Sequence, residues 1–165
     1  MLLGRLSNTL TVDQKGRIVV PSRLRESVGL ADEEPADFQV GCLVDNCLYL
    51  HTEDQHQAFL DNFEQVLGET AQDRMLKTIL NSSFVQVSTD KANRLSIPSF
   101  LLKKAGIKKE VVVVGMRERV EIWDAAVHAA MEAKHRSEFE LRLEEALERA
   151  GKLNRRRDEG DDQHD

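Results

Sequence analysis

An aspartate and an arginine four positions apart occur twice in this chain, each time around a short turn. The first pair is Asp13 and Arg17, and the second is Asp90 and Arg94. A carboxylate can hold an arginine in place for contact with an anion, because the guanidinium group matches phosphate and base-edge acceptors. The same pair could also be an ordinary surface salt bridge, which contributes only about 0–1 kcal/mol. The spacing alone leaves both interpretations open.

The two pairs belong to a longer internal repeat. Residues 11–30 read TVDQKGRIVVPSRLRESVGL, and residues 88–107 read STDKANRLSIPSFLLKKAGI, with no gap needed between them. A repeat seen twice indicates two copies of one supersecondary unit rather than an array. We therefore predict an N-terminal domain over residues 1–82, a second domain over 83–150 and a charged, disordered tail over 151–165. Because the chain has 5% aromatic residues, each half alone would have a thin core, so we expect the halves to pack on each other.

Hydrophobic patterning predicts the same elements in both copies, which makes the fold class α+β. In each copy two short strands flank the turn, a short helix follows a proline, and a second hairpin leads into longer helices. Gly16 supplies the positive φ of the first turn, and Asn93 takes its place in the second. Thr52 to Gln55 fits a helix capping box. The predicted strands cover residues 10–13, 17–20, 38–44, 47–50, 84–88, 94–97, 111–114 and 120–123, and the predicted helices cover 22–28, 53–67, 71–81, 99–105 and 124–150.

The net charge of −6 disguises two basic segments. Residues 1–30 carry a net charge of +3 and residues 81–123 carry +4, whereas residues 31–80 carry −9. The local field, not the total charge, decides where an anion binds. Both copies of the repeat lie in the basic segments, so the repeat is the candidate anion-binding region.

The first copy has the features of a DNA-binding hairpin. Cationic side chains at the tip of a two-stranded ribbon can enter a DNA groove, and arginine can contact guanine through two hydrogen bonds. The absence of a side chain at the turn glycine lets the backbone approach phosphates closely. Asp13 would orient Arg17 instead of touching the duplex. The candidate DNA-binding residues are Lys15, Gly16, Arg17, Arg5, Arg23 and Arg25, with Asp13, Asp90 and Arg94 as supporting residues of the motif.

These motifs resemble those of the MraZ family of bacterial transcriptional regulators. The matching segments are MLLG at the N-terminus, DQKGR-IVVP, STDKANR-LSIP, and KEVVVVGMRERVEIWD at residues 109–124. The resemblance implies two tandem swapped-hairpin, AbrB-like halves of β-barrel-like form, each followed by helices. It also implies DNA binding through Lys15, Gly16 and Arg17. The second copy departs from the pattern, because Ala92 and Asn93 stand where the first has Lys15 and Gly16, so its turn could serve subunit packing instead.

The resemblance further implies a homo-oligomeric ring that represses its own division and cell-wall operon. A head-to-tail ring presents its hairpins in one orientation, which suits direct repeats of a short DNA box. The expected partners are thus double-stranded promoter DNA and further copies of the chain, in the cytoplasm and associated with the nucleoid. No membrane or small-molecule partner and no cofactor are expected.

Other functions have weaker support. The acidic segment 53–73 favours an alternative function, an oligomeric protein-interaction scaffold or antitoxin-like partner. Cys42, Cys47, His51 and His56 could suggest zinc, but their spacing is not that of a zinc finger, and two buried thiols are the simpler interpretation. The sequence contains no phosphate-binding glycine-rich loop or paired catalytic carboxylates, so we do not expect an enzyme.

Overall fold

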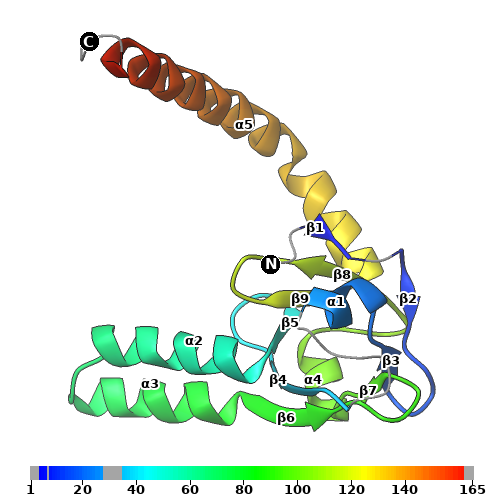
Figure 1. The fold of residues 1–165 in the computed structure, drawn as a ribbon. Coiled ribbons are helices and arrows are strands. Elements are labelled where there is room, and N and C mark those ends of the chain that lie inside the picture. Colours follow the sequence, from blue (N-terminus) through cyan, green and yellow to red (C-terminus); the bar gives the residue numbers. More distant parts are fainter. Residues whose placement is uncertain (1–3, 7, 28–34, 162–165) are drawn as a thin grey trace. The chain divides into compact units, whose positions relative to one another are not determined.

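One antiparallel sheet organises the body of the protein in its computed structural model, which describes residues 4–6, 8–27 and 35–161 (Figure 1). Its strands are β1 Gly4–Arg5, β2 Leu10–Thr11, β4 Asp37–Gly41, β5 Cys47–His51, β6 Phe84–Ser88, β8 Glu110–Gly115 and β9 Val120–Asp124. They lie in the order β1, β8, β9, β5, β4 and β6, and β2 also pairs with β8. The predicted α+β class and both of the later hairpins, β4–β5 and β8–β9, are confirmed.

The first strand of each copy pairs with the hairpin of the other copy. β6 of the second copy lies against β4 of the first, with Val40 opposite Val85. In the reciprocal pairing, β2 of the first copy lies against β8 of the second, with Leu10 opposite Val111. This exchange confirms the swapped-hairpin arrangement. It also means that the division at residue 82 separates two sequence repeats that share one sheet.

The predicted hairpin pairing is present only next to each turn, where the Asp13 amide donates to the Arg17 carbonyl at 3.0 Å, the Asp90 amide donates to the Arg94 carbonyl at 2.9 Å, and Thr89 bridges Leu95. The strand after the first turn, β3 (Arg17–Val19), pairs with the strand after the second turn, β7 (Arg94–Ser96), and the two make a separate ribbon. We had expected each of these strands to pair with the strand before its own turn. The alternation of apolar residues specifies which face of a strand is buried, but it does not specify which strand lies beside it.

A single core confirms that the halves pack on each other. Buried side chains of the two copies meet between the sheet and the β3–β7 ribbon, and they include Ile18 and Val20 beside Leu95 and Ile97. A domain of this size buries a larger share of its apolar surface than either half could bury alone. The turns that carry the polar motif are thus fixed to one shared core.

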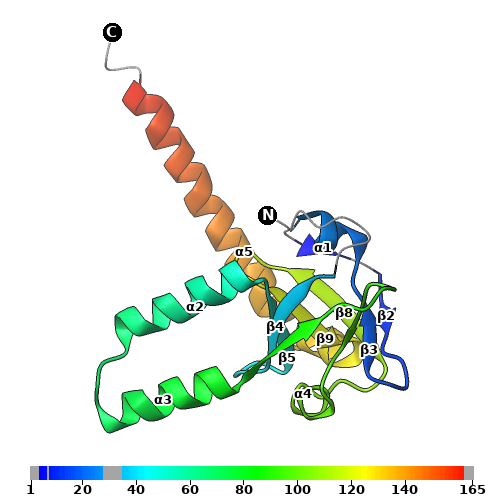
Figure 2. The same ribbon diagram turned by 60° about the horizontal axis from the view of Figure 1, so that its bottom comes forward.

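Two helices between the copies form a projecting pair (Figure 2). They are α2 (Glu53–Val66) and α3 (Ala71–Ser82), and an ion pair of 2.9 Å between Lys77 Nζ and Glu64 Oε2 connects them. The predicted capping box at the start of α2 is confirmed. The Thr52 hydroxyl accepts a hydrogen bond from the Gln55 amide at 3.3 Å, and Gln55 Oε1 accepts one from the Thr52 amide at 3.0 Å. The pair leaves large apolar side chains exposed, namely Val66, Met75, Leu76 and Ile79.

Three further helices lie in the described part of the chain. The short helices α1 (Ser22–Ser27) and α4 (Ser99–Lys104) follow β3 and β7, as predicted, and α5 spans Ala125–Asp161. Asp124 Oδ1 accepts hydrogen bonds from the amides of Ala126 and Val127, so it caps α5 as its position suggests.

The last helix corrects the prediction of a disordered tail over residues 151–165. α5 continues through residues 151–161, and residues 162–165 lie outside the described part of the chain. Glutamate and arginine side chains four positions apart, such as Glu138 with Arg142 and Arg136 with Glu140, support the helix with ion pairs. Residues 1–128 form one compact unit, and the part of α5 from Ala129 on belongs to a second unit.

Candidate nucleic-acid interface

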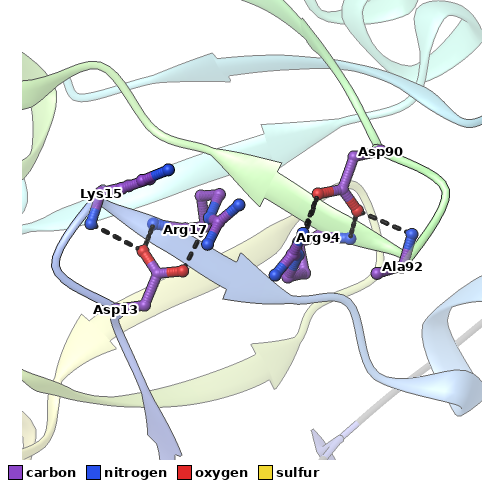
Figure 3. A network of polar contacts seen from close by, with 6 residues as sticks. All are labelled: Asp13, Lys15, Arg17, Asp90, Ala92 and Arg94. Carbon is purple, nitrogen blue, oxygen red and sulfur yellow. Dashed lines mark hydrogen bonds and ion pairs between the residues drawn. The ribbon is translucent and has the colours of Figure 1, made fainter.

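The first turn is closed by the carboxylate of Asp13 (Figure 3). Asp13 Oδ1 accepts hydrogen bonds from the backbone amides of Lys15 and Arg17, both at 2.9 Å, and Oδ2 accepts one from Arg17 Nε at 2.7 Å. The Asp13 amide also donates to the Arg17 carbonyl at 3.0 Å. One aspartate therefore fixes both the backbone of the turn and the start of the guanidinium group.

The second turn repeats this geometry. Asp90 Oδ1 accepts from the amides of Ala92 and Arg94 at 2.9 and 3.0 Å, and Oδ2 accepts from Arg94 Nε at 2.9 Å. Asn93 has φ of +58° and the equivalent Gly16 has φ of +73°, which confirms the predicted left-handed residue in both turns. The repeated sequence therefore specifies a repeated local structure.

Hydrogen bonding holds both aspartates in the charged form. Their pKa values lie below the ordinary carboxyl value, chiefly because the backbone amide of the arginine donates to the carboxylate in each turn, at Arg17 and at Arg94. The arginine side chain adds to this effect. The turns thus keep their geometry throughout the neutral pH range.

The two turns point away from each other. Because β3 and β7 are antiparallel, Arg17 lies opposite Ser96 and Arg94 lies opposite Val19, at opposite ends of the ribbon (Figure 3). Matching hydrogen bonds tie each turn to the other copy. The Ile97 amide donates to the Gly16 carbonyl at 2.9 Å, and the Val20 amide donates to the Asn93 carbonyl at 2.8 Å. The two turns are therefore separate candidate contacts at the two ends of one ribbon.

The structure brings together only some of the predicted cations. Lys15 is exposed at the tip of the first turn, and Arg17 beside it keeps 23% of its side chain exposed. Arg5 is exposed on β1, but it lies opposite Val114, roughly 13 Å along β8 from the strand end nearest the turn. Arg5 is therefore separate from the turn.

The two arginines of α1 do not join the first turn either. α1 begins just after Val20, which bonds the second turn, so the exposed Arg23 belongs to the opposite end of the ribbon. Arg25 is buried, with only 2% of its surface exposed, and this corrects its prediction as a DNA contact. The error has one cause, because a helix that follows a turn in sequence was taken to lie beside it.

The helix beside the first turn is α4 of the second copy. A Cβ atom placed on Gly16 would lie 3.2 Å from Leu102 Cδ1 and 3.1 Å from the Ile97 carbonyl oxygen. Exposed lysines end this helix, at positions 103 and 104, and two more lie just before β8, at positions 108 and 109. Sequence reasoning noted the positive charge of residues 81–123 but did not connect it with the first turn.

The residues considered for zinc pack among aromatic rings. His51 Nδ1 and His56 Nδ1 lie 3.3 Å apart, and Phe59 and Phe84 stack around them. Burial lowers the pKa of His51 to about 4. Within residues 4–6, 8–26 and 35–152, whose side chains are described, no three histidine, cysteine or acidic side chains are grouped as a metal site would require.

Two further observations concern the cysteines and the apolar character of the helices. Both cysteines, Cys42 and Cys47, are buried free thiols, and burial raises the pKa of each. None of the helices in the described residues is long and apolar enough to cross a lipid bilayer.

Comparisons with known proteins agree with the repeat and the turn motif. A family model described as "MraZ protein, putative antitoxin-like" matches residues 4–79 and again residues 82–150. The chain is 32% identical to the transcriptional regulator MraZ of Mycoplasmoides gallisepticum over 124 residues, which cover 75% of this chain and 82% of the relative. It is 30% identical to the transcriptional regulator MraZ of Legionella pneumophila over 71% of this chain and 76% of the relative. It is 28% identical to the protein of that name from Natranaerobius thermophilus, over 90% of this chain and 98% of the relative. The chain therefore belongs to the MraZ family and, like its relatives, is a transcriptional regulator.

Proposed function

We propose that this regulator binds double-stranded promoter DNA through its first turn. The observation that carries the proposal is the set of hydrogen bonds from Arg17 to the Asp13 carboxylate, which we call the aspartate clasp. It holds Arg17 in place while Lys15 stays exposed beside it. A preorganised arginine loses less side-chain freedom on binding and can reach a guanine edge through two hydrogen bonds. The lysine adds a sequence-independent phosphate contact.

The second turn has the same clasp but a different surface. Ala92 replaces Lys15, so the exposed lysine of the second turn is Lys91, one position earlier than the lysine of the first. Because the turns lie at opposite ends of the ribbon, the two tips are separate surfaces that can serve different partners. We assign DNA binding to the first turn and subunit packing to the second.

A homo-oligomeric ring would give several first turns to one operator. The exposed apolar residues of α2 and α3, among them Met75, Leu76 and Ile79, support self-association because such groups of apolar side chains are usually covered. Head-to-tail subunits present identical turns in one orientation, which suits direct repeats about one helical turn apart. Several modest contacts then add by multivalency on the promoter of the protein's own operon, where binding represses transcription.

The test is an electrophoretic mobility shift with the DNA upstream of the protein's own gene. Arg17→Ala and Lys15→Ala should both abolish the shift, and light scattering should give each the assembly mass of the wild type. Lys15→Ala is the more stringent variant, since only the backbone amide of Lys15 contacts Asp13. The matched control is Arg94→Ala, which removes the equivalent arginine from the second turn. Normal binding by Lys15→Ala and Arg17→Ala would refute the assignment.

A protein-interaction scaffold is the second candidate. The same exposed residues of α3 and the acidic character of residues 53–73 would suit a different protein partner. A pull-down from nuclease-treated lysate separates the two functions, because a scaffold keeps its partner when DNA is absent. Loss of that partner in Ile79→Glu but not in Lys15→Ala would favour the scaffold.

A further inference from the structure

The first turn lies against the second copy of the repeat. The Gly16 carbonyl accepts a hydrogen bond from the Ile97 amide at 2.9 Å, and the Cβ position of Gly16 is 3.2 Å from Leu102 Cδ1. Leu102 lies on α4, so this helix touches the back of the turn that carries Lys15. The helix behind the first turn therefore comes from residues about 85 positions further along the chain.

The two lysines at the end of α4 differ in position relative to the turn. Successive residues of a helix are rotated by about 100°, so Lys103 lies on the flank of Leu102 and Lys104 lies on the far side of the helix. Both side chains are exposed. Burial raises the pKa of the Cys42 thiol and the nearby Lys104 ammonium partly offsets that rise, which places Lys104 toward Cys42. Lys103 is therefore the lysine of α4 beside the first turn.

A further lysine approaches the turn from the strand side. The Val12 amide, one residue before Asp13, donates to the Lys109 carbonyl at 2.7 Å, and Lys109 is exposed. The nearest acidic residue on that strand, Glu110, is paired with Thr11, one position farther from the turn. Lys103 and Lys109 thus belong to the two segments that contact the first turn and the strand before it, α4 and the residues leading into β8.

The equivalent place at the second turn carries the opposite charge. Glu26 corresponds to Lys103 in the repeat, and it is exposed on α1, the helix that follows the Val20 bond to Asn93. Ala92 corresponds to Lys15. The backbone geometry of the two turns is therefore the same, but the helix position that holds Lys103 beside the first turn holds an acidic residue beside the second, where the exposed cations are Lys91 and Arg23 instead.

We propose that Lys103 and Lys109 are phosphate-contacting residues that extend the DNA-binding surface of the first turn. The inference rests on the proposed function and adds residues that the turn motif does not contain. Lysine acts on phosphate as a mobile point charge, so these two residues contribute affinity and not base specificity. The exchange of strands between the copies thus places the basic residues of the second copy beside the DNA-reading turn of the first.

The experiment measures the salt dependence of DNA binding by the full chain. The probes are the duplex upstream of the protein's own gene and an unrelated duplex of equal length. Loss of each lysine–phosphate contact should make the slope of log affinity against log salt shallower by about 0.9. Lys103→Ala and Lys109→Ala should each show this change and weaken binding to both duplexes by the same factor. Lys104→Ala, which removes an equal charge from the next residue, should bind like the wild type, and Lys103→Arg should keep the wild-type slope.

The outcomes separate the inference from the proposed function. The role of Lys103 would be overturned if Lys103→Ala and Lys104→Ala gave the same slope of log affinity against log salt. If Arg17→Ala abolished binding in the same series, the first turn would remain the DNA-binding site. Wild-type binding by Arg17→Ala would overturn both proposals. The inference is supported if the slope of log affinity against log salt is shallower in Lys103→Ala and returns to the wild-type value in Lys103→Arg. A merely structural role for the side chain would not depend on its charge.

Discussion

Replacing Gly16 with alanine should destabilise the protein more than the same change at Gly106. Both glycines have a left-handed backbone, with φ of +73° and +66°. Alanine in that conformation costs about 1–2 kcal/mol. At Gly106 no atom lies within 4 Å of the new Cβ, so the conformational cost stands alone. At Gly16 the new Cβ lies 3.1 Å from the Ile97 carbonyl oxygen and 3.2 Å from Leu102 Cδ1.

The crowding at Gly16 adds to the conformational cost. The Ile97 oxygen cannot move easily, because the amide of the same residue is bonded across the ribbon to the Gly16 carbonyl. Overpacking of this kind costs about 1–3 kcal/mol, which gives a total of about 2–5 kcal/mol for Gly16→Ala. Each kcal/mol lowers the Tm of a chain of this length by about 2–4 °C.

Thermal unfolding followed by circular dichroism at fixed protein concentration measures these differences. Gly16→Asn should lie closer to the wild type than Gly16→Ala, since asparagine adopts the same conformation at Asn93 with φ of +58°. The reasoning would be refuted if Gly16→Ala lowered the Tm no more than Gly106→Ala did.

Three further perturbations test other parts of the structure. Asp13→Asn should leave the fold intact but weaken binding to the upstream duplex in a mobility shift. An amide nitrogen in place of Oδ2 cannot accept a hydrogen bond from Arg17 Nε. Unchanged affinity would contradict the role of Asp13 in positioning Arg17. Because the pKa of His51 falls from 6.5 to about 4, the free energy of unfolding should decrease as the pH drops between those values, by up to about 3 kcal/mol. His51→Phe should flatten that dependence, and an ordinary imidazole titration by NMR would argue against it. Leu76→Glu with Ile79→Glu should reduce the assembly mass in light scattering while the circular dichroism spectrum stays unchanged, because both side chains are exposed.

The local structure of the turns followed directly from the sequence. The Asp-to-Arg spacing, the left-handed residues at Gly16 and Asn93 and the capping box at Thr52 all depend on residues within five positions of one another. Interactions of that range leave a readable pattern, because the donor and acceptor types must occur at fixed offsets.

The partners of the strands did not follow from the sequence. The strands around Leu10 and Ile18 show the alternation of apolar and polar residues that is typical of half-buried strands. The same alternation fits a hairpin between these two strands or pairing of each with a strand of the other copy. The burial of Arg25 was missed for the same reason, since its position depends on which copy its helix packs against. The continuation of α5 past residue 150 was missed because the charged composition of that segment was taken as a sign of disorder.

The bond between the Ile97 amide and the Gly16 carbonyl has a consequence for biosynthesis. When the ribosome has completed only the first copy, β3 lacks its partner strand β7 and the first turn lacks the helix α4 behind it. Pairing between segments so distant in sequence also folds slowly, because the loop between them must be closed first. We therefore expect the first turn to become ordered only after residues beyond Ile97 have left the exit tunnel, and, on the proposed function, a chain that ends at the repeat boundary should not bind the promoter.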